Sequence, residues 1–341
     1  MSTKEEVLKL LNSNKGSFIS GQEIAGALNV SRAAVWKAIK SLESDGLGIE
    51  AVTNKGYRLS DEADVIDPGY IRDKLKEEGL DVKVLYKDET GSTNADAVDL
   101  LKGSDVPVLV IADKQNAGRG RKGRDFYSPK GSGLYMSLSM RDALTLIKTA
   151  RVTAVAAVAV AEAIDRVVFG GKECSLIKWV NDIYLDDKKV CGILSEAMIS
   201  MEDEASGTVV VGIGINVYEP VGGFPDEISS RAGYLIGQYD RGRYAGNNDS
   251  GRGLRSHLAK EIISGFFRYL NEPDDSLKIY RDKSYLTGKY VTVNSFVPND
   301  KRAGSRARVL GIDDECRLLI EYEDGSREAL SSGEVSVLPT P

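Results

Sequence analysis

The chain has 341 residues, of which 42% are hydrophobic and 28% are charged, and its formal net charge is −6. These values predict two or three globular domains with ordinary packed cores. The single histidine, His257, argues against Ser-His-Asp hydrolysis and His-rich zinc sites. No apolar run reaches the roughly 18 residues of a membrane span. A polar N-terminus and three widely spaced cysteines favour a cytoplasmic protein without membrane attachment.

Residues 1–62 are expected to form a winged helix-turn-helix DNA-binding domain. Ser20 is a good N-cap for a short helix that Asn29 ends, and Ser31 can cap a second helix. Two β-rich runs around residues 54–56 then resemble a wing, and the second helix would enter the major groove. A small helical protein-interaction module is the alternative. The residues expected to face DNA are Arg32, Trp36, Lys37, Lys40, Lys55 and Arg58, although Trp36 alone could equally belong to the core.

Residues 63–285 follow an acidic linker and alternate irregularly between helix and strand. Apparent hairpins imply a mixed sheet, so an α+β domain is favoured over a doubly wound one. Residues 218–253, rich in Gly, Asp, Asn and Arg, are expected to form a mobile loop to which no role can be assigned. The expected helices cover residues 70–78, a segment that starts at Ser92 or Thr93, and residues 145–168, 253–270 and 274–285.

Residues 286–341 contain short runs that alternate between apolar and polar side chains. Turn sequences such as Glu323-Asp324-Gly325 separate these runs. A segment of this length and pattern predicts a small SH3-like β-barrel.

The Gly-Arg loop, residues 118–124 with the sequence GRGRKGR, is the most unusual local feature. Its glycines match the dinucleotide pattern G-x-G-x-x-G, but no helix is expected after it, so that match is rejected. The pattern is also no Walker A motif, because Arg124-Asp125 stands where Lys-Ser or Lys-Thr is needed. A protein kinase is excluded because no HRD motif is present.

Four cations in seven residues remain to be explained in this loop. Glycine lets a backbone approach a ligand closely, and arginine donates two hydrogen bonds to carboxylate or phosphate oxygens. The composition therefore favours an anion-binding loop that orders when its charges are neutralised. A nucleic-acid-binding or merely solvated surface loop is the alternative. The four cations are Arg119, Arg121, Lys122 and Arg124.

Several motifs together resemble those of biotin–protein ligases, in order and in spacing. They are ETGSTN at 89–94, DKQNAGRGRKGR at 113–124, GSGLYMSLS at 131–139, KWVND at 178–182, CGIL with Glu196 at 191–196, and VGIGIN at 211–216. With the winged helix in front and the small barrel behind, nearly the whole chain resembles the bifunctional ligases that also repress the biotin operon.

The resemblance implies an enzyme that makes biotinyl-5′-AMP from biotin and MgATP. The adenylate would then acylate one lysine of a biotin carboxyl carrier domain. The same adenylate would act as corepressor, promoting a homodimer that binds operator DNA.

The resemblance also implies roles for individual residues. Biotin would be bound by Ser92, Thr93, Asn94, Gln115, Arg119, Gly120, Arg121, Lys178, Gly212 and Gly214. The nucleotide would be bound by Arg121, Arg124, Phe126 and Asn181. Lys178 and Arg121 are the expected catalytic cations, with Arg119 ordering the loop. No metal ligand is expected with certainty, and Asp182 is a weak candidate.

Two departures from the family pattern are visible. Val180 stands where these ligases usually have proline, and Phe126 stands where they often have tryptophan. Gly212 and Gly214 could also be plain strand-packing positions.

Three alternatives remain at this level. A lipoate–protein ligase would be expected to carry a stretch like RRxSGGGxVxHD, which is missing. A repressor without ligase activity would not need the Arg loop and Lys178. The third alternative is a ligase whose winged helix only modulates catalysis.

Overall fold

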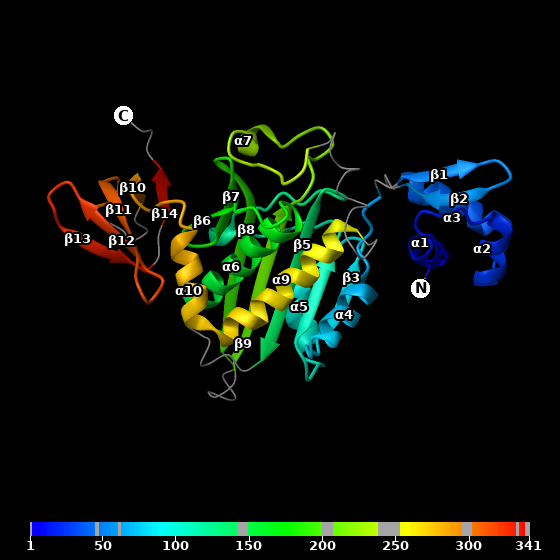
Figure 1. The fold of residues 1–341 in the computed structure, drawn as a ribbon, viewed down its shortest axis with the longest axis horizontal. Coiled ribbons are helices and arrows are strands. Elements are labelled where there is room, and N and C mark those ends of the chain that lie inside the picture. The colour runs from blue at the N-terminus through cyan, green and yellow to red at the C-terminus, as the bar shows by residue number, and fades with distance from the viewer. Residues whose placement is uncertain are drawn as a thin grey trace. The chain divides into compact units, whose positions relative to one another are not determined.

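The computed structural model describes residues 2–44, 48–60, 63–141, 149–199, 207–237, 253–294, 302–331 and 334–337. The chain divides into two compact units (Figure 1). One contains Met1–Asp67 with Ile236–His257, and the other contains Pro68–Leu235 with Leu258–Pro341. No helix in the described ranges is long and apolar enough to cross a membrane.

The first unit contains the expected helix-turn-helix and wing. Ser20 caps the second helix in a capping box with Glu23, and Asn29 ends that helix in the left-handed conformation, at φ 53°. Ser31 Oγ accepts a hydrogen bond from Ala34 N at 3.1 Å, as its capping role predicts. The elements are α1 (Thr3–Ser13), α2 (Gly21–Leu28), α3 (Arg32–Ser44), and the antiparallel pair β1 (Ile49–Val52) and β2 (Gly56–Leu59).

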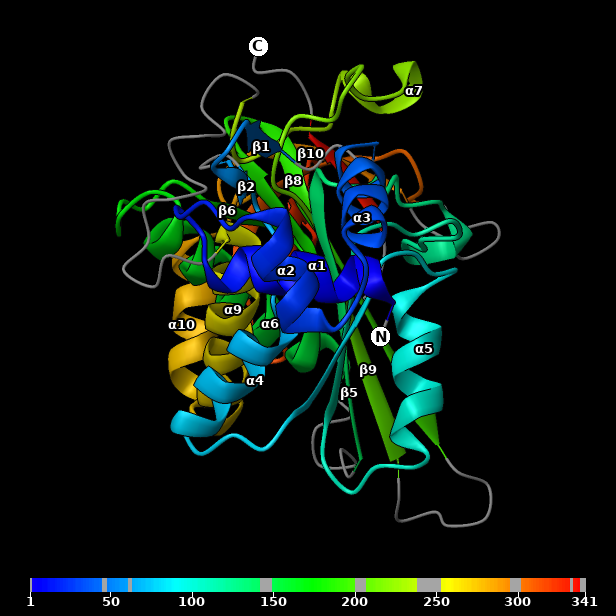
Figure 2. The same ribbon diagram turned by 90° about the vertical axis from the view of Figure 1, so that its right-hand side faces the viewer.

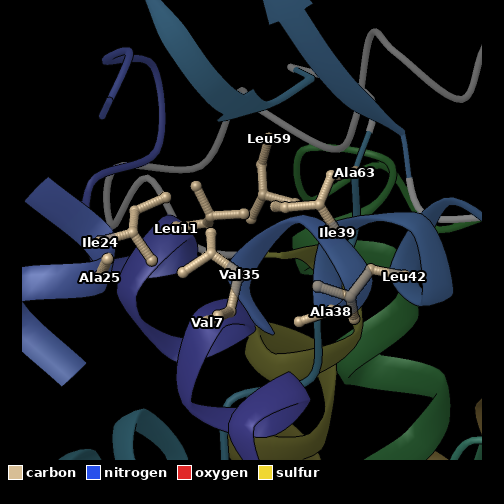
Figure 3. Packing of buried hydrophobic residues seen from close by; sticks show 10 residues of the cluster. All are labelled: Val7, Leu11, Ile24, Ala25, Val35, Ala38, Ile39, Leu42, Leu59 and Ala63. Atoms are coloured by element: carbon tan, nitrogen blue, oxygen red, sulfur yellow. The ribbon is translucent and has the colours of Figure 1, made fainter. Parts of the chain in front are cut away.

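The helices and the wing of this unit share one apolar core (Figure 3). Val35, Ile39 and Leu42 lie on one face of α3 and are almost fully buried, as their spacing predicts. Gly56, at φ 102°, closes the wing turn against the backbone of Ile19, where a side chain would collide. The core consists of Val7, Leu11, Ile24, Ala25, Val35, Ala38, Ile39, Leu42, Leu59 and Ala63.

The second unit is built on a seven-stranded mixed sheet in the order β3-β4-β5-β9-β8-β7-β6. Among the pairs of neighbouring strands in this sheet, β3 and β4 run parallel and all the others run antiparallel, which confirms the predicted α+β architecture. The strands are β3 (Lys83–Lys87), β4 (Val108–Ala112), β5 (Gly133–Arg141), β6 (Leu176–Lys178), β7 (Asp182–Leu185), β8 (Lys188–Ile199) and β9 (Gly207–Asn216).

The stretch from residue 176 to 199 forms three strands, β6, β7 and β8. Asp186 and Asp187, both at positive φ, form the β7–β8 turn that the sequence indicates. A second turn, at Trp179–Asn181, separates β6 from β7 and contains a cis Trp179–Val180 peptide bond. The KWVND motif therefore spans this turn, with Lys178 ending β6 and Asp182 beginning β7.

Helices cover both faces of this sheet (Figure 2). Helix α5 packs on β4, β5 and β9, while α6 packs on β6 to β9 and is itself covered by α10. The Ala/Val-rich α6 is buried nearly all round, as its composition predicts, whereas residues 145–148 of the expected helix lie outside the described ranges. The helices are α4 (Pro68–Glu77), α5 (Thr93–Leu101), α6 (Thr149–Val167), α7 (Asp226–Ser229), α9 (Leu254–Asn271) and α10 (Pro273–Asp282).

The C-terminal residues form a separate five-stranded antiparallel sheet in the order β13-β12-β11-β10-β14. Alternate side chains such as Val291, Val293 and Ile320 are buried, as the sequence alternation predicts. The strands are β10 (Tyr290–Asn294), β11 (Arg306–Ile312), β12 (Leu318–Tyr322), β13 (Arg327–Leu330) and β14 (Glu334–Val337).

Candidate functional site

One cleft of about 740 Å³ in the second unit brings the predicted site residues together. Its walls come from the N-terminus of α5, the Gly-Arg loop, the β6–β7 turn, β8, β9 and the segment after β9. Every residue predicted to bind biotin or nucleotide lines this cleft. They are Ser92, Thr93, Asn94, Gln115, Arg119, Gly120, Arg121, Arg124, Phe126, Lys178, Asn181, Gly212 and Gly214, and Asp182 lines it too.

Polar side chains at the start of α5 are held in fixed orientations. Ser92 occupies the N-cap position, but its side chain makes no capping hydrogen bond. Instead Gln115 Oε1 accepts from Thr93 N at 2.9 Å and from Thr93 Oγ1 at 3.0 Å. Gln115 Nε2 then donates to Ser128 Oγ at 3.1 Å, which connects this end of the cleft to the segment that follows the Gly-Arg loop.

Two residues that the sequence reasoning missed complete this network. Ser137, fully buried on β5, donates to Asn94 Oδ1 at 2.6 Å and lies 2.7 Å from Thr93 Oγ1. Asn94 Nδ2 donates to Glu196 Oε2 on β8 at 2.9 Å. Both residues sit inside motifs that were recognised, GSGLYMSLS and CGIL with Glu196, but their contacts depend on strand pairing.

The glycines of β9 are required by close approaches to the cleft residues. A side chain at Gly212 would collide with the amide of Asn94. At Gly214 an added Cβ would lie 2.5 Å from the ring of Phe126. Both positions therefore do more than pack a strand, because a larger residue would displace a side chain that lines the cleft.

The Gly-Arg loop is a closed hairpin. Gly120 N donates to Arg124 O at 2.7 Å, and Phe126 N donates to Gly118 O at 2.8 Å. The chain between them contains only one short 3-10 turn, Arg121–Gly123. No α-helix follows the loop, which agrees with the rejection of the dinucleotide pattern.

The charges of this loop turn partly into the cleft. Arg121 reaches across the cleft, where its Nη1 lies 3.4 Å from Asn181 Oδ1. Arg119 and Arg124 line the cleft as well, whereas Lys122 does not. Three arginines of one loop thus line the cleft, an arrangement suited to a ligand that carries carboxylate or phosphate oxygens.

Two lysines, not one, belong to the cleft. Lys178 Nζ donates to Tyr184 Oη at 3.3 Å and lies 5.2 Å from the centre of that ring. Burial, followed by the nearby Asp182 charge, raises the pKa of Tyr184 to about 12, so its hydroxyl stays protonated at neutral pH. Lys178 is therefore held beside a neutral hydroxyl group.

The second lysine, Lys189 at the start of β8, was not singled out from the sequence. It forms an ion pair with Asp182 at 2.6 Å, and its Nζ would lie 3.2 Å from a Cβ placed on Gly192. Its amine therefore lies beside a glycine of the cleft wall. A register shift between β7 and β8 brings Lys189 to the face of Gly192 and not to that of the buried Cys191, so regular alternation along β8 gave no signal for it.

Part of the segment expected to be a mobile loop, residues 218–253, is ordered against the cleft. Arg231 O accepts from Lys189 N, and Lys189 O accepts from Gly233 N, both at 2.8 Å. Phe224 packs between Tyr127 and Tyr234, at 6.4 Å from each ring centre. The expectation is therefore wrong for residues 218–237, because backbone pairing with β8 orders a polar sequence. Residues 238–252 lie outside the described ranges.

The cleft contains few acidic side chains. Within the described parts of the chain, no group of three or more His, Cys, Asp or Glu side chains could hold a metal ion. Asp182, the weak candidate from the sequence, is already ion-paired with Lys189.

The residues predicted to face DNA lie in the first unit. Trp36 is 56% exposed, which contradicts the alternative that it belongs to the core. Arg32, Lys37, Lys40 and Lys55 are also exposed. Arg58 differs, because its Nε donates to Glu50 Oε2 at 2.9 Å across the wing and its guanidinium covers the Phe18 ring. The exposed face of α3 is therefore the main candidate for a nucleic-acid interface.

Comparisons with protein-family models match three parts of the chain. An HTH domain matches residues 3–58, the biotin/lipoate A/B protein ligase family matches residues 86–216, and a biotin protein ligase C-terminal domain matches residues 288–338.

Whole-chain comparisons agree with these matches. The bifunctional ligase/repressor BirA of Bacillus subtilis is 35% identical over 330 residues, covering 96% of this chain and 97% of that protein. The protein of the same name from Escherichia coli is 34% identical over 203 residues, covering 59% of this chain and 60% of its own. A biotin protein ligase from Aquifex aeolicus, solved with biotin and ATP, shares the fold, with a TM-score of 0.57 and 24% identity over 76% of this chain and 99% of that one.

Proposed function

The chain belongs to the family of bifunctional biotin–protein ligases and repressors, and we propose that it activates biotin with MgATP and transfers the biotinyl group to a lysine of a biotin carboxyl carrier domain. The observation that carries this proposal is the cleft, in which every residue predicted for biotin and nucleotide is gathered. Those residues come from segments far apart in the chain, so their convergence is not a consequence of one local motif.

The uncharged end of the cleft suits the ring system of biotin. A ureido group needs hydrogen-bond donors and an acceptor in a small pocket, which hydroxyl and amide side chains supply. Ser92, Thr93, Asn94 and Gln115 offer these groups, and Ser137 and Glu196 hold Thr93 and Asn94 in place. Gly212 gives Asn94 the room it needs beside the ring.

The charged end suits the first half-reaction. A biotin carboxylate oxygen attacks the α-phosphorus of ATP, an acyl–phosphate bond forms, and pyrophosphate leaves. The two reactants are both anions, so cations must offset their repulsion and the charge of the transition state. Arg119, Arg121, Arg124 and Lys178 line this region with Lys189. The Mg²⁺ arrives with ATP as part of the substrate.

Lys178 and Lys189 both contribute to the role expected of Lys178 alone. Lys178 is an expected catalytic cation by resemblance, and it faces the hydroxyl of Tyr184. The amine of Lys189 lies beside Gly192, which also borders the ring of Phe126. Lys189 is therefore the better placed of the two lysines to reach an anion bound in the cleft. We assign the α-phosphate to both, with Asp182 keeping Lys189 in position.

In the second half-reaction, the amine of the carrier lysine attacks the acyl carbon, an amide forms and AMP leaves. The same adenylate would serve as corepressor. Its binding would promote a homodimer whose two winged helices contact a palindromic operator through Arg32, Trp36, Lys37, Lys40, Lys55 and Arg58.

Mass spectrometry of a carrier domain after incubation with the protein, ATP and biotin tests the ligase. Lipoate in place of biotin is the parallel arm. Biotinylation of one lysine is expected, and lipoylation alone would overturn the assignment. For the repressor, a gel shift on the biotin operator should require biotinyl-5′-AMP, and sedimentation should show ligand-dependent self-association.

A further inference from the structure

The β6–β7 turn, Trp179–Asn181, is held from outside the cleft by a tyrosine hydroxyl. Tyr280 on α10 is fully buried, and its Oη donates to Val180 O at 2.9 Å. Tyr280 does not line the cleft, whereas Trp179 and Asn181 do. Helix α10 thus supports the wall of the cleft from behind.

The carbonyl held by Tyr280 belongs to the peptide group that carries Asn181. Because a peptide group is planar, restraining Val180 O also restrains the backbone nitrogen and Cα of Asn181. The Asn181 amide meets Arg121 Nη1 at 3.4 Å and donates to Ile193 O at 2.6 Å. A hydrogen bond outside the cleft is therefore connected to two side chains inside it.

The residue at position 180 explains why the β6–β7 turn needs this support. Val180 stands where the ligases that the chain resembles usually have proline, and valine lacks the ring that restricts φ. Two side-chain hydrogen bonds restrain the same turn here. Besides Tyr280, Trp179 Nε1 donates to Cys316 O in the β11–β12 turn at 2.9 Å.

The hydroxyl of Tyr280 stays protonated at neutral pH and can donate. Burial raises the pKa of Tyr280 well above its ordinary value of 10.0. Arg121 acts in the opposite direction and Asp182 in the same direction, so both of these cleft residues lie within electrostatic range of the hydroxyl.

We propose that Tyr280 is a positioning residue for adenylation, which holds the Trp179–Asn181 turn so that Asn181 and Arg121 meet the nucleotide in productive geometry. Tyr280 does not touch the substrate. The inference rests on the function proposed above and extends it to α10. The nucleotide end of the cleft then depends on Tyr280. The biotin-ring end, which is formed by α5 and Gln115, does not depend on it.

Tyr280→Phe tests this, because it removes one oxygen and keeps the ring. Biotin-dependent release of pyrophosphate should show kcat/KM for MgATP reduced on the order of 10-fold, since small misplacements of positioning groups cost this much or more. The Kd of biotin without nucleotide should stay within roughly 2-fold of wild type. The substitution removes no contact of the residues assigned to the biotin ring.

Tyr269→Phe is the matched control. Tyr269 on α9 is 4% exposed, and its Oη donates to Glu162 Oε2 at 3.1 Å, away from the cleft. The same atom is removed from another largely buried tyrosine, whose hydroxyl also accepts from Arg268 Nη2 at 2.7 Å, so the variant controls for the loss of a hydrogen-bonded hydroxyl outside the cleft. Adenylation by this variant should equal that of wild type.

Two outcomes would overturn the inference. One is wild-type adenylation in Tyr280→Phe, and the other is a loss of biotin affinity as large as the loss in adenylation. In an Asn181→Ala background, Tyr280→Phe should cost little more, whereas fully additive effects would contradict a shared route. Wild-type protein that releases no pyrophosphate with biotin would remove the proposed function together with the inference.

Discussion

Asp64 and Arg255, 191 positions apart in the sequence, form a buried ion pair in the first unit. Their side chains are 0% and 5% exposed, and Arg255 Nε lies 3.3 Å from Asp64 Oδ2. Arg255 Nη2 also donates to Asp64 O at 2.6 Å, and Gly253 leaves the space that the carboxylate occupies. The first turn of α9 is thereby attached to the segment that follows the winged helix, so this unit is completed by residues from much later in the chain.

Removing one partner of this pair should destabilise the first unit strongly. Arg255→Met leaves a buried carboxylate without its cation, which is expected to cost about 3–5 kcal/mol of unfolding free energy. Urea denaturation of the full chain measures this. Arg166→Met is the control, because Arg166 pairs with Glu261 at a half-exposed site and should cost about 0–1 kcal/mol. Equal losses in the two variants would contradict the buried-pair argument.

Gly214→Ala should damage the nucleotide end of the cleft. The added methyl group would lie 2.5 Å from the ring of Phe126 and must push it aside, at an expected cost of about 1–3 kcal/mol. The KM for MgATP should rise, as measured by pyrophosphate release. Gly103→Ala meets no atom within 4 Å and serves as control. An unchanged KM in Gly214→Ala would show that the Phe126 ring is not part of the nucleotide site.

The two cleft lysines should both matter for adenylation. Lys178→Met and Lys189→Met are each expected to lower kcat on the order of 10²–10³-fold, as for the loss of one preorganised charged donor. Lys188→Met, at the neighbouring position outside the cleft, should have little effect. Single-turnover formation of the adenylate is the measurement. Full activity of either cleft variant would assign the α-phosphate to the other lysine alone.

Tyr184 should make stability fall at high pH. Its pKa in the folded chain is about 12, against an ordinary value of 10.0, so the unfolded chain loses this proton first. The contribution is fully present below pH 10.0 and is lost as pH rises towards about 12. Urea midpoints measured across this range should fall less steeply for Tyr184→Phe than for wild type. Parallel curves would show that the hydroxyl is not buried in solution.

Trp36→Ala and Lys37→Ala should weaken operator binding without changing adenylation, because both side chains are exposed on α3. If Lys37 contacts a phosphate, its loss should reduce the slope of log affinity against log salt by about 1 for each substituted subunit. Titration of operator DNA at several salt concentrations tests this. Loss of biotin-dependent pyrophosphate release in the same variants would instead indicate a damaged fold.

Local sequence determined a large part of this protein. Capping residues such as Ser20 and Ser31 set where helices begin, because their side chains bond to nearby backbone groups. The spacing of Val35, Ile39 and Leu42 defined the buried face of α3. Glycines and arginines at 118–124 indicated a loop for anions, and the lack of an expected helix after them excluded a dinucleotide fold. These features depend on neighbours within a few positions.

Only the tertiary structure decided how distant segments meet. Lys189 became a cleft residue through the pairing of β7 with β8, and residues 218–237 became part of the wall by hydrogen bonding to Lys189. Ser137, Glu196 and Tyr280 gained their contacts from partners 43 to 102 positions away. Periodicity and capping carry no information at such separations, because these contacts arise from the packing of whole strands and helices. The motifs thus predicted the chemistry of the cleft, and the packing decided which side chains hold it in place.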